Sequence, residues 1–194
     1  MDFVQTVADL DQSPELHTAR LLLLLDAFSE DGQGGAIEGL TKLAKLDFLL
    51  RYPVMLERAL ESKGRPTRQL QLEDHERQSV ESEMVRYLFG PWDHRYREFL
   101  NILVAQDLAS INIEGRKVVI VATELGRDRA RQLADDVLFE PYARRARLLK
   151  RHFDLTATNL MRFIYDTFPE SDERARGDTW IPSKAKGRCR RHQP

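Results

Sequence analysis

The chain lacks several features that define common protein classes. It has one cysteine, Cys189, so it can form no internal disulfide, and a reducing compartment is the default expectation. Its longest apolar run, Leu21 to Leu25, is far shorter than the roughly 20 residues that cross a bilayer. The first residues lack the basic-then-apolar order of a signal peptide. We therefore expect a soluble cytoplasmic protein with no membrane contact.

An excess of charge of either sign is also missing. The 194 residues contain 30 Lys and Arg and 31 Asp and Glu, for a net charge of −1, so any affinity for nucleic acid must come from a local patch. There is no glycine-rich phosphate loop and no Gly-x-Ser-x-Gly elbow, and the five histidines do not have metal-ligand spacing. We expect no enzymatic activity, no metal and no cofactor.

Helical periodicity dominates what is present. Apolar spacing predicts helices over residues 14–28, 40–50, 54–60, 94–107, 123–153 with a pause near Pro141, and 156–168. Ser13 and Pro14 are typical of a helix start, and Thr123 is expected to cap the helix that follows it. Pro53 should end the second helix, because the residue before a proline avoids the helical conformation. The helix over 94–107 should bury Phe99, Leu100, Leu103 and Val104.

A β-hairpin is the clearest local signal. Residues 108–113 and 117–122 read as two strands joined by the tight turn Glu114-Gly115-Arg116. A helix, a strand pair and a further helix form the back half of a winged helix, for which residues 14–28 and 40–50 can supply the front half. The predicted fold is mainly α with a small β-hairpin, a winged-helix-like domain with additional helices. An unrelated helical bundle with one hairpin is the competing interpretation.

The expected domain covers residues 13–169, between a flexible leader at 1–12 and a basic, disordered tail at 170–194. The polar stretch 67–80 is a mobile connection or an exposed helix. The domain could therefore consist of two lobes joined near residues 62–80. Apolar alternation after residue 81 predicts an extended strand that stops at Gly90-Pro91.

Two groups of basic residues are candidate DNA contacts. Arg116 and Lys117 lie at the hairpin tip, where a wing can contact phosphate, although a solvated turn is the simpler interpretation. Arg144, Arg145 and Arg147 lie in a dense basic run that could meet a phosphate backbone or an acidic partner helix, or form a solvated face with helical ion pairs.

An aromatic and basic group surrounds Gly90-Pro91 and is the candidate partner-binding site. Its members are Arg86, Tyr87, Phe89, Trp92 and Arg95. Aromatic residues and arginine are enriched at interface hot spots. The same aromatics could instead cap the core where a strand meets a helix.

Two segments carry a resemblance to a known family. Gly39-Leu-Thr-Lys-Leu-Ala-Lys-Leu-Asp-Phe-Leu-Leu-Arg-Tyr-Pro53 and Met84-Val-Arg-Tyr-Leu-Phe-Gly-Pro-Trp-Asp93 resemble the small middle component of bacterial three-component ABC-ATPase systems, a group that includes Lamassu-type anti-phage defence. The likeness spans roughly residues 14–168. It implies a winged-helix adaptor without chemistry of its own, which accompanies an SMC/Rad50-like coiled-coil ATPase and an effector subunit and meets double-stranded DNA through that complex.

A different class of function fits the same fold. A free winged-helix transcriptional regulator would bind an operator as a dimer. The near-neutral charge and the lack of a clean basic recognition helix favour the adaptor over the regulator.

Overall fold

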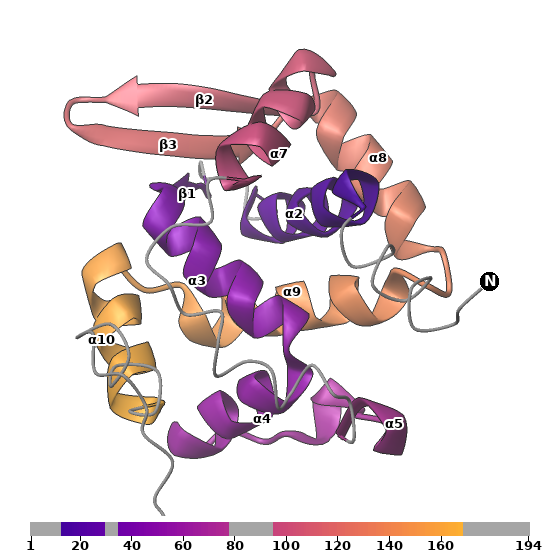
Figure 1. The fold of residues 1–194 in the computed structure, drawn as a ribbon, viewed down its shortest axis with the longest axis vertical. Coiled ribbons are helices and arrows are strands. Elements are labelled where there is room, and N and C mark those ends of the chain that lie inside the picture. Colours follow the sequence, from indigo (N-terminus) through magenta and orange to yellow (C-terminus); the bar gives the residue numbers. More distant parts are fainter. Residues whose placement is uncertain (1–12, 30–34, 78–94, 169–194) are drawn as a thin grey trace, which may run out of the picture.

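The computed structural model describes residues 13–29, 35–77 and 95–168. Helices make up most of these residues, and one small antiparallel sheet lies at an edge of the molecule (Figure 1). A mainly α fold with a β-hairpin is thus confirmed.

The helices and strands follow one another along the chain with short connections. The helices are α2 (Pro14–Ser29), α3 (Leu40–Arg51), α4 (Pro53–Ser62), the 3₁₀ turn η1 (Arg68–Leu70), α5 (Asp74–Arg77), α7 (Arg95–Ala105), α8 (Glu124–Ala134), α9 (Glu140–Phe153) and α10 (Ala157–Thr167). The strands are β1 (Ile37–Glu38), β2 (Ala109–Glu114) and β3 (Lys117–Ala122).

Local sequence signals set several of these boundaries. Thr123 accepts a hydrogen bond from the Gly126 amide at 2.9 Å and caps α8 as expected. Pro53 separates α3 from α4 and begins α4, because a proline tolerates the first helical turn but not the interior. The pause expected near Pro141 lies just before it, since α8 ends at Ala134 and Pro141 is in the first turn of α9.

The sheet has the strand order β1-β3-β2. Ile120 of β3 lies opposite Ile111 of β2 on one side and opposite Ile37 of β1 on the other. Gly115 turns the hairpin with φ +63°, a conformation that a glycine adopts without strain. The two-residue strand β1 was not predicted, because it lies among Gly32, Gly34, Gly35 and Gly39, where the sequence has no strand pattern.

The core is built around α2, whose residues Leu21 to Leu25 are all buried. Helices α3, α7, α8 and α9 and strand β3 all contact α2, so its leucine-rich middle is covered on every side, as a segment that is apolar all round requires (Figure 1). The segment 67–77 joins this core through Leu70, which is fully buried. On α7, Phe99, Leu100 and Leu103 are buried as expected, but the prediction for Val104 is wrong. It lies about 100° around the helix from Leu103 and is 40% exposed.

A buried polar network joins α2, α3 and α7. The Arg20 guanidinium donates two hydrogen bonds to the Asp47 carboxylate at 2.6 and 2.9 Å, and the Tyr96 hydroxyl donates a third at 2.8 Å. Arg20 also lies 2.9 Å from Nδ1 of His17, whose ring stacks on Phe99 with centroids 4.8 Å apart. A bidentate, fully hydrogen-bonded pair is the arrangement that can offset the cost of burying two charges.

The network makes stability depend on the charge of Asp47. Burial acts to raise the pKa of Asp47, but the charge and hydrogen bonds of Arg20, with the Tyr96 hydroxyl, outweigh it and hold the pKa below its usual value. Because the folded-state pKa lies below the unfolded one, this stabilisation is present above about pH 4 and is lost as the pH falls through the folded pKa.

Replacing Asp47 should therefore be costly. We expect Asp47→Ala to lower the free energy of unfolding by about 3–5 kcal/mol, because it leaves the Arg20 charge buried without its partner. Tyr96→Phe removes one hydrogen bond and should cost only about 1–2 kcal/mol. Urea unfolding of both variants measures the two losses, and a cost below 1 kcal/mol for Asp47→Ala would contradict a structural role for the pair.

Candidate protein-interaction surface

The strongly exposed apolar side chains of the described residues fall in one stretch of the sequence, from the hairpin tip on one side of the molecule to the α8–α9 connection on the other (Figure 1). In residues 13–29, 35–77 and 95–168, every large apolar side chain that is strongly exposed lies between positions 104 and 138. These side chains are Val104, Ile111, Ile113, Val118, Leu125, Val137 and Leu138. We call α7, β2, β3, α8 and the connection 135–139 the apolar half.

The hairpin contributes an apolar face that extends past the core. Ile113 lies opposite Val118, and the next pair inward on the same face is Ile111 with Ile120. Ile120 is fully buried, whereas Ile113 is 78% exposed. The hairpin projects beyond the helices in Figure 1, so the outer positions of this face lie beyond the elements that cover the inner ones.

Backbone contacts hold the base of the hairpin against α8. The Thr123 amide donates to the Leu108 carbonyl at 3.1 Å, and the Thr123 hydroxyl donates to the Asp107 carbonyl at 2.5 Å. At Gly126 an added Cβ would lie 1.9 Å from the Leu108 oxygen, so only glycine allows this approach. The apolar half is thus a fixed surface whose hairpin and helix are tied together.

A groove of about 650 Å³ lies between α2, α7 and α8. Apolar side chains that line it include Leu22, Ile102, Leu125 and Leu133. Polar side chains also line it, namely Glu15, Thr18, Gln106, Arg129, Gln132 and Asp136. A groove with several aliphatic side chains in its lining can receive the apolar face of a helix.

The hairpin tip carries little net positive charge. Arg116 is exposed, but the neighbouring Lys117 ammonium lies 2.9 Å from the Glu38 carboxylate on β1. Glu114 is at the other side of the turn, opposite Lys117. Two acidic residues thus offset the two basic ones, which does not favour a phosphate contact.

The arginines of α9 do not share one surface. Arg145 is buried and forms an ion pair with Glu76 of α5. Arg144 is paired with Glu140 at 3.2 Å, one turn earlier in the helix, and Arg147 is exposed. Of the three candidate DNA contacts in this run, only Arg147 faces solvent freely enough to meet a phosphate backbone without a change in side-chain packing.

The candidate partner-binding residues lie mostly outside the described ranges. Arg86, Tyr87, Phe89 and Trp92 belong to residues 78–94. Arg95 is the first residue of α7 and is half-buried.

Within the described ranges, no three His, Cys, Asp or Glu side chains gather into a group that could hold a metal ion. No helix in the same ranges is long and apolar enough to cross a membrane. Comparison with protein-family models, with curated proteins and with solved structures gave no match to this chain. The geometry alone defines the class, a mainly helical fold that carries a small three-stranded antiparallel sheet.

Two arginines of α9 provide a matched test of this geometry. Arg145→Ala should lower the free energy of unfolding by about 3 kcal/mol, because it leaves the Glu76 carboxylate without its partner at a largely buried position. Arg147→Ala, two residues along the same helix and exposed, should change it by less than about 0.5 kcal/mol. Chemical denaturation of both variants measures the two free energies of unfolding. Equal losses would show that Arg145 is not held in a buried pair.

Proposed function

We propose that this chain is a non-catalytic accessory subunit that binds another protein through its apolar half. The observation that carries the proposal is the confinement of the exposed large apolar side chains to positions 104–138. Three of these side chains, Ile111, Ile113 and Val118, share one face of the hairpin, and exposed apolar surface that gathers in this way marks interaction sites. A rigid hairpin beside an apolar groove offers such a site without any ordering cost for its own backbone.

The arrangement of elements supports a winged-helix assignment. Helices α2, α3 and α7 with the sheet order β1-β3-β2 follow the helix and strand order of that fold, with the β2-β3 hairpin as the wing. In this interpretation α4, η1 and α5 belong to an insertion between the second and third helices, and α9 and α10 form an extension. An apolar wing suits a protein contact better than a phosphate contact.

The resemblance to three-component ABC-ATPase systems suggests the partner. An SMC-like ATPase has long coiled-coil helices, and the groove between α2, α7 and α8 suits the apolar face of a helix. The proposed role is an adaptor that joins such an ATPase to its effector in defence against phage or plasmid DNA.

The exposed side of α7 argues against the transcriptional regulator. This helix would be the recognition helix, yet its exposed positions are Arg97, Glu98, Asn101, Val104 and Ala105. One basic residue beside one acidic and two apolar residues is a poor match to the phosphates and base edges of a major groove.

The test combines two changes at the most exposed apolar positions. Ile113→Asp with Leu138→Asp should abolish co-purification with a co-expressed SMC-like ATPase, because two carboxylates would be desolvated at the contact. The melting temperature of the isolated subunit should stay within about 2 °C, since exposed substitutions change stability little.

Thr158→Asp is the matched control, because it adds a carboxylate at an exposed position of α10, outside the apolar half. It should leave co-purification intact. Retained binding by the double variant, or equal loss in the control, would refute binding through the apolar half.

A further inference from the structure

The end of α4 forms a rigid turn that presents two cations. The Arg65 amide donates to the Leu60 carbonyl at 2.9 Å and the Gly64 amide to the Glu61 carbonyl at 2.8 Å, the paired bonds of a Schellman cap. Gly64 has φ +62°, as this cap requires. Lys63 and Arg65 are therefore attached to a backbone with one defined conformation.

This turn packs against the last residues of α9. The Lys63 ammonium donates to the His152 carbonyl at 2.7 Å and lies 4.6 Å from the centre of the Phe153 ring. Arg151 is exposed and donates to the Gln69 side chain at 3.2 Å, which ties α9 to η1. The contacts bring basic residues from distant parts of the sequence to one place.

The electrostatics of His152 show that positive charge accumulates there. Burial lowers the pKa of His152, and so do the charges of Arg65, Arg151 and Lys63. Burial and Arg65 likewise lower the pKa of Lys63. The charges of Arg65, Arg151 and Lys63 all act on His152, so the three cations lie close enough together for one anion to be attracted by all of them.

Compensation of the α9 dipole explains only part of this cluster. Cations near a helix C-terminus are favourable, and Lys150 and Arg151 lie in the last turn. Lys150 is, however, paired with Asp154 at 2.9 Å, and Lys42 shares the same carboxylate at 2.8 Å. Arg65 follows α4 and is not part of α9. It adds positive charge near the end of α9, which already has basic residues in its last turn, so the helix dipole does not account for Arg65.

The cluster is broad and open. Arg68 is exposed beside Gln69, and Arg147 is exposed one turn before Arg151 on α9. Exposed guanidinium groups spread over η1 and α9 match a row of phosphates better than a single enclosed phosphate, and arginine is the residue best suited to that contact.

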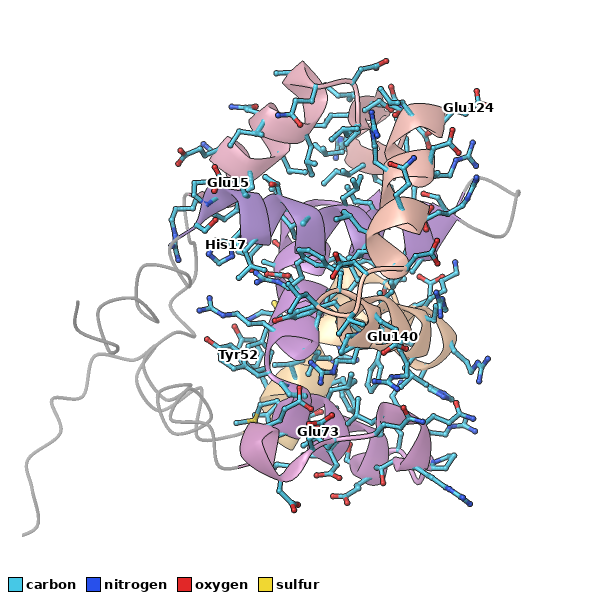
Figure 2. The ribbon with its side chains drawn as sticks, turned by 90° about the vertical axis from the view of Figure 1, so that its right-hand side faces the viewer. Glu15, His17, Tyr52, Glu73, Glu124 and Glu140 are labelled. Atoms are coloured by element: carbon cyan, nitrogen blue, oxygen red, sulfur yellow. The ribbon has the colours of Figure 1, made fainter. Side chains whose placement is uncertain are left out.

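We propose that Lys63, Arg65, Arg151 and His152, with Arg68 and Arg147 beside them, bind the phosphate backbone of a nucleic-acid duplex. This basic end lies away from the hairpin (Figure 1). Figure 2 likewise shows Glu124, at the start of α8, and Glu73, just before α5, at opposite ends of the molecule. The site thus adds a nucleic-acid contact to the proposed function and does not depend on which protein binds the apolar half.

The test uses the full chain and a short duplex of random sequence. Arg65→Glu with Arg151→Glu should weaken duplex binding at least about tenfold near 0.1 M salt, and the slope of log affinity against log salt should fall by about 2. Arg65→Gln with Arg151→Gln should give a smaller loss in the same direction. Both positions are exposed, so thermal melts should match the wild type.

Arg129→Glu with Arg131→Glu is the matched control, since it reverses two exposed charges on α8 and leaves the basic tail unchanged. It should bind the duplex almost as the wild type does. Wild-type affinity in the Arg65/Arg151 variants, an equal loss in the control, or no duplex binding by the wild type at low salt would each overturn the site.

Two competitors separate the sources of the anion. If polyglutamate displaces the duplex equally well at equal charge, an acidic protein is the ligand and the proposal fails. If inorganic phosphate displaces it far better than chloride at equal ionic strength, the site holds a free phosphate and the proposal fails as well. Co-purification of the Arg65/Arg151 variants with the ATPase tests the apolar half separately.

Discussion

The buried ion pair between Arg20 and Asp47 is the constraint on which the arrangement of the molecule depends. Apolar packing alone would hold α2 in many rotations, because its middle is leucine on every side. A bidentate guanidinium with a third hydrogen bond from Tyr96 accepts only one geometry, and it fixes α2, α3 and α7 together. Helix α7 leads directly into β2, with Asp107 in the left-handed conformation at its end. The direction in which the hairpin projects therefore follows from a contact deep in the core.

The two ends of the domain differ in chemistry. The apolar half has exposed aliphatic side chains and balanced charges at the hairpin tip, whereas the turn after α4 and the end of α9 gather cations. The proposed protein contact and the proposed nucleic-acid contact therefore lie on separate surfaces. An accessory subunit in a DNA-sensing ATPase complex would need this property, and the near-zero net charge of the chain conceals it.

Local patterns in the sequence predicted local structure. The hairpin, the Thr123 cap and the break at Pro53 depend on neighbouring residues, and the structure has all three. The Arg20 network and the pairing of Arg145 with Glu76 join residues 27 and 69 positions apart, so no periodicity reveals them. The sequence therefore predicted Arg145 as a DNA contact, although it is buried.

The exposed apolar residues were also hard to predict. The sequence predicts that Val104 is buried, because apolar spacing alone cannot separate a core face from an exposed apolar face. Three aliphatic residues could have indicated the apolar half. Ile113 lies next to the hairpin turn, and Val137 and Leu138 follow the end of α8, where solvent-exposed residues are usually polar.

Hydrogen–deuterium exchange of the chain, alone and with the proposed SMC-like ATPase partner, tests the central claim most directly. Amides that become buried at an interface exchange more slowly, while the remainder of the fold keeps its rates. Binding through the apolar half predicts slower exchange in α7, the β2-β3 hairpin and the segment from α8 to residue 139. Unchanged exchange there, with slowing confined to α4, α9 and α10, would contradict it.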